Sequence, residues 1–485
     1  MQNSDLATFG NNRMVAIQNS RKVTTFTRIV SGATLPDPLR VYESILQKSI
    51  LPACLLESAT HKGEKGRYSF ICLFGKPFCI MHKMKSLTSL KRRMEDISPL
   101  PHSTLPFIGG AVGYIGHEAI TGVETTVKLH PIDPFNLPVI ALYCFHCVIA
   151  LDHETSTLHY LVSVPTSWKV KLGYREACRL VKEMESFVSD SSHEDGIQDV
   201  ATMKSIISNP SKCEFIDMIT RAKRYILSGD VFQVVLSRRL SLRFQGNGVA
   251  LYRALRTINP SPYLFHMRTD GKCRDATLLG SSPEIMADIR NCEMVIRPLA
   301  GTRKRGKTPA GDNRNAKALL HNQKERAEHK MLVDLALNDV RRFCLANSVK
   351  VTKLMEPEYF SHVIHMASEV RGKLKENVHP LDACIGSLPA GTLSGCPKVR
   401  ALQLIAELEA CQRGPYGGAF GWFTDWSLDT CIFIRSALLL DGVLYWQTGA
   451  GIVSDSDPQM EYAETVKKAK AMEKALNEMQ NAQKS

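Results

Sequence analysis

The sequence predicts a mixed α+β protein, because two kinds of pattern alternate along it. From about residue 23 to 165, β-like runs such as RYSFICLFG, FIGGAVGYIG and LHYLVSV are separated by Gly and Pro, which is typical of a sheet-rich region. Helical periodicity follows over residues 173–188 and again in EFIDMITRAKRYILSGD, which leads directly into a strand, VFQVVLSRRLSLRF. Further strands and helices alternate from there to the end of the sequence.

These patterns divide the chain into four parts. Residues 1–22 are polar and are expected to form a tail, without the apolar core of a secretion signal. Their low acid content leaves an organelle transit peptide open. Residues 23–188 form the sheet-rich subdomain, and 189–210, which begin with SDSSHEDGIQD, are the expected linker. Residues 211–478 form the second, larger domain.

Composition favours a globular protein of the cytoplasm. Of the 485 residues, 44% are hydrophobic and 22% charged, and no apolar run reaches the ~18 residues of a membrane span. The one CxxC motif lies in ALYCFHCVIAL, which we expect to be a single buried strand. Residues three apart on a strand face opposite sides, so these cysteines cannot chelate one metal there. We therefore expect reduced cysteines and no membrane association.

A net charge of +13 raises the alternative of a nucleic-acid-binding protein. The dense basic run KMKSLTSLKRRM (83–94) has no interleaved aromatic residues, and a solvated helix face explains it equally well. We therefore expect no nucleic-acid partner. A positive field would also attract a small anionic substrate.

Two pairs of glutamates point to a cation site. Glu325 and Glu328 lie in QKERAEHKMLVDLALNDV, and Glu461 and Glu464 lie in PQMEYAETVKKAKAMEKAL; both stretches are expected to be helical. Residues three apart share a face of a helix, so each helix can direct two carboxylates at one point. Four facing carboxylates would repel unless a cation lay between them, and an all-oxygen set suits Mg²⁺. Two solvated helix faces are the alternative.

Other segments carry residues suited to anion binding and proton transfer. The Gly-rich stretches at 388–396 and 449–451 have backbone N–H groups for an anion, unless they are plain turns. His365 in HVIHMASEV is a proton-transfer candidate if it faces a cleft, and otherwise a core histidine. Arg435 is the single cation in CIFIRSALLL, and a buried Arg needs an anionic partner. ERAEH lacks the first His of HExxH, so a zinc hydrolase is not expected.

In their order along the chain, these segments resemble the chorismate-binding enzymes, and most closely the large subunits of anthranilate synthases. The matching segments are LLES, GAVGYIG, GDVFQVVLSRR, GSSPE, RPLAGTRKRG, KERAEHKMLVDLALND, HVIHMASEV, LPAGTLSGCPKVRA, RGPYGGAFGW, IRSALL and GAGIVSDSDPQMEYAET. The resemblance implies two large antiparallel sheets flanked by helices, with a deep central cleft. It implies a Mg²⁺-dependent lyase that converts chorismate and ammonia to anthranilate and pyruvate, the first step of tryptophan biosynthesis.

The resemblance also implies roles for individual residues. Glu328 and Glu464 would bind Mg²⁺ directly, with Glu461 and the further catalytic residue Glu325 beside them. Thr392 would lie beside the substrate ring, and His365 would donate a proton to the departing C4 hydroxyl. The residues implied to hold the two carboxylates of chorismate are Gly449, Ala450, Gly451 and Lys468 for the ring carboxylate, and Tyr416 and Arg435 for the enolpyruvyl carboxylate.

Two positions bear on the incoming nucleophile. Family members that add water carry a Lys base where this sequence has Gln233, and Gln cannot take up a proton. Many aminodeoxychorismate synthases carry a nucleophilic Lys at the position of Ala300, which has no amine. The resemblance therefore favours ammonia and anthranilate, with aminodeoxychorismate synthase as the alternative. It also implies a separate glutamine amidotransferase subunit as the ammonia source, and hence a hetero-oligomer.

A regulatory site for tryptophan is the last implication of the resemblance. The segments LLES and NPSPYLF resemble the two halves of the family's feedback pocket, although a strand end and a turn would explain them separately. The residues implied to line it are Leu55, Glu57, Ser58, Asn259, Pro262, Tyr263 and Leu264.

Overall fold

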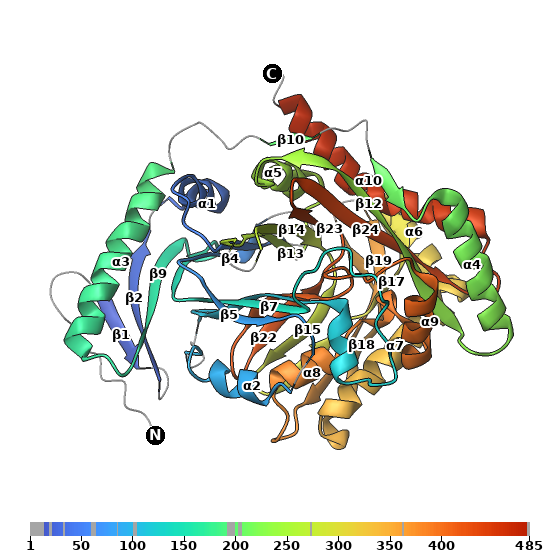
Figure 1. Cartoon of the computed structure of the whole chain (residues 1–485), viewed down its shortest axis with the longest axis horizontal. Coiled ribbons are helices and arrows are strands. Elements are labelled where there is room, and N and C mark those ends of the chain that lie inside the picture. Colours follow the sequence, from blue (N-terminus) through green and yellow to red (C-terminus); the bar gives the residue numbers. More distant parts are fainter. Residues whose placement is uncertain are drawn as a thin grey trace.

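Two large antiparallel sheets pack face to face, and helices cover their outer surfaces (Figure 1). The structure is a computed structural model. It describes residues 14–18, 22–32, 34–59, 65–84, 86–99, 104–191, 199–201, 206–271, 274–360 and 363–482. This architecture confirms the α+β class and the pair of flanked antiparallel sheets that the sequence predicted.

The first sheet has 14 strands within the described residues and combines the N-terminal region with the C-terminal strands. In spatial order its strands are β1 (Met14–Gln18), β2 (Val23–Ser31), β9 (Thr157–Pro165), β8 (Cys147–Asp152), β4 (Lys65–Leu73), β3 (Ala53–Ala59), β13 (Tyr263–Arg268), β14 (Ala276–Ser282), β23 (Ser436–Leu440), β24 (Val443–Ile452), β12 (Gln233–Gln245) and β10 (Val200–Ala201). Two short strands, β11 (Ile207–Asn209) and β20 (Gly395–Cys396), also pair with β12. Strands far apart in the sequence are therefore neighbours in one sheet.

The second sheet has 10 strands in the part of the chain that the structure describes. Their order is β17 (Leu299–Lys304), β19 (Val363–Lys373), β16 (Glu293–Ile296), β15 (Ile285–Arg290), β22 (Leu428–Ile432), β21 (Ala419–Phe423), β6 (Gly110–Ile115), β7 (Ile140–Phe145) and β5 (Lys76–Met81), with β18 (Lys350–Tyr359) also paired to β19. Both sheets thus mix N-terminal and C-terminal strands, so neither belongs to one sequence half alone.

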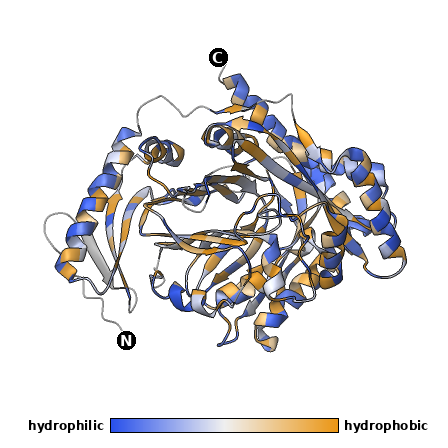
Figure 2. Cartoon of the chain, viewed as in Figure 1, coloured by the Kyte–Doolittle hydropathy of each residue, from blue (hydrophilic) through white to orange (hydrophobic). Residues whose placement is uncertain are grey.

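Helices pack on the outer faces of both sheets. The first sheet is covered by α1 (Pro38–Gln47), α3 (Val170–Asp190), α5 (Val249–Ile258) and α10 (Pro458–Ala482), and, at β12 and β24, by α4 (Lys212–Leu227) and α9 (Lys398–Leu408). The second sheet is covered by α2 (Thr88–Met94), α6 (Pro309–His321), α7 (Gln323–Phe343) and α8 (Pro380–Ser387), with short 3₁₀ turns at η1 (His117–Gly122), η3 (Ala346–Ser348) and η4 (Gly391–Leu393). Hydrophilic and hydrophobic residues alternate along these helices in Figure 2, as expected for helices with one face on a sheet and the other in solvent.

Strand alternation sends neighbouring side chains to different cores. On β3, Leu55 packs with the helices that cover the first sheet, whereas Leu56 packs into the apolar layer between the two sheets. That inner layer is rich in aromatic residues, such as Phe265 stacked on Phe420 with ring centroids 3.9 Å apart. Successive residues of a strand point to opposite faces, which is why one apolar run supplies both layers.

Three segments differ from the sequence-based expectation. ALYCFHCVIAL is two strands in different sheets, because the chain leaves β7 after Phe145 and enters β8 at Cys147. The polar segment 304–324 begins as a loop, as its composition indicates, but forms the helix α6 from Pro309, with the Thr308 side chain as its N-cap. The GAG stretch at 449–451 lies inside β24 rather than in a turn. Local apolar patterns do not specify which sheet a strand joins, so the two changes in strand assignment follow from tertiary pairing.

Two of the expected chain divisions contain ordered structure. Within residues 1–22, β1 pairs with β2, and within residues 189–210, β10 and β11 pair with β12. Residues 1–13, 19–21, 192–198 and 202–205 lie outside the described residues. The division into domains stays a prediction, since both sheets draw strands from the two parts.

Candidate active site

The two glutamate pairs lie at the beginnings of α7 and α10. Asn322 caps α7 by accepting a hydrogen bond from the Glu325 N–H at 3.0 Å. Burial raises the pKa of the Glu328 carboxyl, and the charges of Glu325 and Glu464 raise this pKa further. The charge of Glu464 also raises the pKa of Glu461, after burial. Carboxylates from two helices, distant in sequence, are therefore close enough to repel one another.

Each of these carboxylates also has a protein partner. Glu464 pairs with Lys468 at 2.7 Å, and Glu461 accepts a hydrogen bond from Ser456 at 2.7 Å. Among the described residues, no three His, Cys, Asp or Glu side chains gather closely enough to form a metal site by themselves. The donor set nevertheless suits a hard cation, because it is all oxygen and the charge of Glu464 raises the pKa of Glu328 and of Glu461. Water and an anionic substrate would supply the remaining ligands of Mg²⁺.

Lys468 stands among the predicted site residues. Its Nζ donates to the Gly449 carbonyl oxygen at 2.9 Å in addition to its ion pair with Glu464. Its charge lowers the pKa of groups on four different segments, namely Glu284, Glu328, His365 and Glu461. The charge of one ammonium group, in contact with Glu464 and Gly449, therefore acts on side chains from α7, α10, β19 and the β14–β15 connection.

The GAG stretch brings β24 into close contact with two other site residues. A Cβ added at Gly449 would lie 3.1 Å from the Tyr416 hydroxyl, and one at Gly451 would lie 2.3 Å from Gln233 Nε2. Larger residues would displace these side chains, which explains the two glycines. The pairing of β24 with β23 ends at Trp446, so beyond it one edge of β24 is not covered by that strand. Backbone N–H groups on that edge are suited to bind a carboxylate.

Tyr416 and Arg435 form a second polar region of the site. Burial raises the pKa of Tyr416 and lowers the pKa of Arg435, and each group's charge acts on the other. Arg435 has a positive φ of 52°, which few non-glycine residues adopt. No carboxylate acts on Arg435 within the part of the chain that the structure describes. A desolvated guanidinium without an acidic partner is suited to bind an anionic ligand.

His365 is neutral at physiological pH. Burial lowers the pKa of its imidazole to about 4, and the charges of Arg435 and Lys468 act in the same direction. Its Nδ1 lies 2.8 Å from the Gly301 carbonyl oxygen, which can only accept, so Nδ1 carries the proton. The Nε2 atom of the neutral ring then has a lone pair instead of a proton. In this state His365 can accept a proton at Nε2, and its role as the proton donor to the C4 hydroxyl stays a prediction.

Glu284 is a functional candidate that the sequence reasoning missed. Its carboxyl is fully buried beside Thr392, whose hydroxyl donates to Glu284 Oε1 at 3.0 Å. Burial raises the pKa of Glu284 to about 8, so the group carries a proton at neutral pH. The resemblance of GSSPE to its family counterpart was the available signal, but the raised pKa depends on neighbours from distant segments. Glu284 can therefore donate a proton at neutral pH, whereas His365 has a lone pair at Nε2.

Gln233, the residue that bears on the choice of nucleophile, contacts the acidic cluster. Its side chain forms a hydrogen bond that lowers the pKa of Glu328, and it is 3% exposed. Among the described residues, its Oε1 is a buried acceptor without a hydrogen-bond donor. A ligand that carries N–H groups could satisfy this acceptor, because leaving it unpaired costs free energy. Ala300 lies in β17 and offers no such group.

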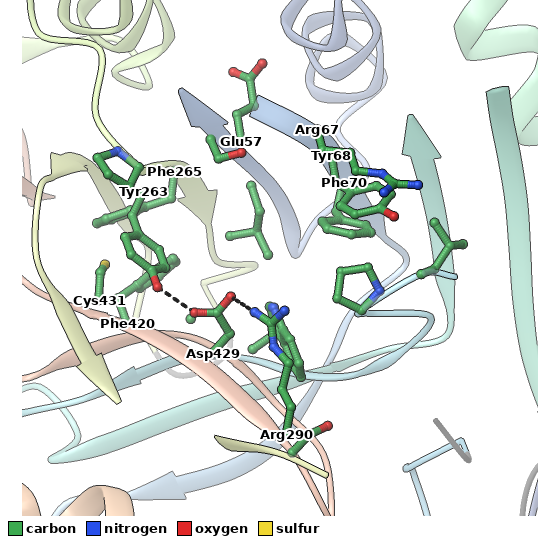
Figure 3. A pocket seen from close by; sticks show the side chains of 18 of the residues that line it. Glu57, Arg67, Tyr68, Phe70, Tyr263, Phe265, Arg290, Phe420, Asp429 and Cys431 are labelled. Carbon is green, nitrogen blue, oxygen red and sulfur yellow. Dashed lines mark hydrogen bonds and ion pairs between the residues drawn. The ribbon is translucent and has the colours of Figure 1, made fainter. Parts of the chain in front are cut away.

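A cavity of about 670 Å³ lies between the two sheets, apart from the acidic cluster (Figure 3). Its walls include the predicted residues Glu57, Ser58, Pro262, Tyr263 and Leu264. The predicted Leu55 faces the helices on the other side of β3, and Asn259 is bonded to Ser281 away from the lining. This volume is typical of a site for one small organic molecule.

The cavity combines aromatic walls with charged groups of both signs. Tyr263 donates to Asp429 at 2.7 Å, and Arg290 holds the other oxygen of that carboxylate at 2.6 Å (Figure 3). Glu57 lies in the wall at β3, but its carboxylate points away from the cavity toward α5, where it accepts hydrogen bonds from Tyr252 at 2.8 Å and Arg256 at 2.7 Å (Figure 3). The wall residues that the sequence reasoning missed include Leu56, Arg67, Tyr68, Trp422 and Trp426. Such a lining suits an aromatic zwitterion.

Comparison with known proteins agrees with this arrangement. A family model described as chorismate binding enzyme matches residues 52–474. Anthranilate synthase component 1 of Geobacillus stearothermophilus is 38% identical over 483 residues, covering 92% of each chain. The probable anthranilate synthase component 1 of Schizosaccharomyces pombe is 38% identical over 436 residues, covering 87% of each chain.

Solved structures share the fold over nearly the whole chain. The crystal structure of anthranilate synthase component I from Streptococcus pneumoniae TIGR4 has a TM-score of 0.72 at 29% identity, covering 97% of this chain and 96% of that one. The menaquinone-specific isochorismate synthase of Escherichia coli also has a TM-score of 0.72, at 20% identity, which is a likeness of fold.

The fold and the matching family model define the class: the chain belongs to the chorismate-binding enzymes. Within that class it is a member of the anthranilate synthase component 1 family, because curated members match it along almost their full length. It is thus an enzyme, as the sequence predicted. Among the described residues, none of the helices is both long enough and apolar enough to span a bilayer.

Proposed function

We propose that the chain is the chorismate-converting subunit of an anthranilate synthase. In this reaction chorismate and ammonia give anthranilate, pyruvate and water. The observation that carries the proposal is that the charge of Lys468, which contacts Glu464 and Gly449, acts on Glu284, Glu328, Glu461 and His365 from four separate segments. Acids, a neutral imidazole and a cation in one site suit proton transfers on a substrate with two carboxylates.

Glu328 and Glu464 would hold Mg²⁺, with Glu325 and Glu461 acting partly through water. The mutual repulsion of these carboxylates supports a cation between α7 and α10. When bound, Mg²⁺ would neutralise part of the substrate's negative charge and stabilise charge that develops during the reaction. The alternative, two unrelated acidic helix faces, would not require the charge of Glu464 on α10 to raise the pKa of Glu328 on α7.

The chain's own cations and amides would orient chorismate. Arg435 and Tyr416 would bind the enolpyruvyl carboxylate, since the Arg435 guanidinium lacks an acidic partner among the described residues. Lys468 and the backbone N–H groups of Gly449, Ala450 and Gly451 would bind the ring carboxylate. Two positive regions at a fixed separation select a dianion of matching length.

The remaining residues account for the proton transfers. Ammonia adds at C2, with its N–H groups accepted by the free Gln233 Oε1, and the C4 hydroxyl departs as water. Glu284, protonated at neutral pH and bonded to Thr392, would supply the proton for that departure. The lone pair on His365 Nε2 would accept a proton as pyruvate is eliminated and the ring becomes aromatic. In this assignment Glu284 acts as the general acid and His365 acts as the general base.

Ammonia and regulation involve further molecules. We expect a separate glutamine amidotransferase subunit to supply ammonia, and free tryptophan to bind the cavity between the sheets as a feedback inhibitor. Its aromatic walls would accept an indole ring, while Arg290 and Asp429 place charges of both signs beside an amino acid's own two charges. The cysteines within the described residues are all free, which fits a cytoplasmic enzyme.

Product identification tests the proposal directly. The purified chain is incubated with chorismate, Mg²⁺ and an ammonium salt, and the aromatic product is identified by chromatography and fluorescence. We expect the 2-amino isomer, anthranilate, together with pyruvate. Formation of 4-amino-4-deoxychorismate instead would assign the chain to the aminodeoxychorismate reaction. Water as the nucleophile, giving isochorismate, would refute the role assigned to Gln233.

A further inference from the structure

Arg413 is a buried cation that ties separate segments of the site together. Its side chain is 1% exposed, and its guanidinium makes a two-point ion pair with Glu409, from Nε at 2.9 Å and Nη2 at 2.6 Å. The remaining donors reach backbone: Nη1 donates to the Leu393 carbonyl oxygen and Nη2 to that of Val235, both at 2.7 Å. Only the planar fork of Arg can make these contacts from one position.

Both carbonyl groups belong to segments that carry proposed site residues. Leu393 follows Thr392 in η4. Val235 lies two residues after Gln233 in β12, directly opposite Gly451 of β24. The Glu409 carboxylate extends the connection, because its Oε1 accepts from the Ser237 N–H at 2.8 Å and from the Ser237 hydroxyl at 2.7 Å.

Arg413 also holds the loop that carries Tyr416. The guanidinium lies over the Tyr416 ring, 5.8 Å from its centroid. The backbone of this loop is fixed by Glu118, which accepts from the Arg413 N–H at 2.8 Å and from the Gly414 N–H at 3.1 Å. Arg413 thereby fixes the loop through its main chain and contacts Tyr416 through its side chain.

We propose that Arg413, with Glu409, is a positioning residue of the reaction. The pair sets the relative places of Thr392, Gln233 and Tyr416 while its own charge is satisfied within the protein. Stability alone does not require this arrangement, since apolar residues of similar volume can replace a buried ion pair at little or no cost. The inference rests on the proposed function, because that function makes these three residues binding and catalytic groups.

The test uses a double substitution that leaves no unpaired buried charge. In Glu409→Met/Arg413→Met the ion pair and the carbonyl contacts are absent together. The matched control is Glu43→Met/Arg253→Met, which removes an ion pair between α1 and α5 that includes a buried glutamate and no proposed site residue. Chorismate consumption with ammonium gives kcat and KM, calorimetry gives the Mg²⁺ affinity, and thermal unfolding reports the fold.

We expect the Arg413 double variant to lose about 10- to 100-fold in kcat/KM, partly through a higher KM for chorismate. Its Mg²⁺ affinity should stay within about twofold of wild type, because neither residue contacts α7 or α10 carboxylates. The control should keep kcat/KM within about twofold. If the Arg413 double variant also retains kcat/KM within that range, the inference is overturned.

A second variant covers the case in which the double variant does not fold. Arg413→Lys keeps the cation beside Glu409 but cannot also reach both carbonyl oxygens. We expect a folded protein with kcat/KM lowered about 10-fold, and an unchanged value would overturn the inference. Failure of the proposed function is seen separately, in wild type alone, as chorismate consumed without anthranilate. The positioning role is judged only by the ratio of variant to wild-type rates.

Discussion

The Glu284→Gln substitution tests both the protonation and the role of the buried carboxyl. Glutamine has nearly the same shape and can accept the Thr392 hydroxyl bond, but it has no proton to lose. The wild-type carboxyl is fully buried, and burial raises its pKa from 4.5 to about 8. The variant therefore removes a titration while it leaves the packing almost unchanged.

The expected change in stability with pH follows from the two pKa values. Below pH 4.5 the carboxyl is protonated in both the folded and unfolded states, so no stability is lost through its titration there. Between pH 4.5 and about 8 only the folded state keeps the proton, and stability falls by about 1.4 kcal/mol per pH unit. Across the whole window the wild type should lose up to about 5 kcal/mol relative to the glutamine variant.

Urea unfolding at pH 5, 6, 7 and 8 measures this difference for both proteins, with exposed Glu478→Gln as the control. The acid role adds a kinetic signature: wild-type kcat/KM should fall above about pH 8. Glu284→Gln should lower kcat by about 10²- to 10⁴-fold and remove that alkaline limb. Parallel pH dependence of stability in variant and wild type would refute the raised pKa. Near-normal turnover in the variant would refute the acid role.

Four further substitutions test the rest of the site. Glu328→Gln and Glu464→Gln should each fold with unreduced thermal stability, because repulsion between carboxylates is relieved. Each variant should convert chorismate about 100-fold more slowly, or worse, at limiting Mg²⁺. Normal turnover at limiting Mg²⁺ would disprove the metal assignment. Ser58→Arg should stay active but ignore tryptophan, since the new side chain fills the cavity, and inhibition assays giving the wild-type constant would remove the regulatory proposal. Between pH 6.5 and about 4 only the unfolded state protonates the His365 imidazole, so wild type should lose up to about 3 kcal/mol of stability as the pH falls through this range. The His365→Asn variant should not show this loss. If the unfolding free energies of wild type and variant change with pH in the same way over that range, the lowered pKa of His365 is contradicted.

Some elements could be predicted because their signals are local. The helix α4 and the strand β12 follow from periodicity, and α4 begins at a capping box of Ser211 and Glu214. The start of α6 also had a local signal, Thr308 followed by Pro309 and Asp312, although the polar composition of the segment pointed to a loop. By contrast, no local pattern separates β7 from β8, because apolar residues look alike whichever sheet they join.

The roles of buried single residues were beyond a local pattern. Glu284 is one charged residue in a short motif, and Arg413, although four residues after its partner Glu409, lies beyond the end of α9. Glu284 holds its proton because β-strands and η4 exclude water from it, and Arg413 is satisfied by carbonyl groups 20 and 178 residues away in the sequence. Leu55 and Leu56 show the same limit, since only the pairing of β3 decides which of them faces the cavity.

The sequence alone determined that two helices each present a pair of glutamates on one face, because spacing along a helix is fixed by backbone geometry. It also determined the family, through ordered motifs along the chain. Only the tertiary structure decided which groups carry protons, since a pKa depends on desolvation and on charges contributed by distant segments. The same is true of the cavity between the sheets, whose walls come from strands that meet only after the chain has folded.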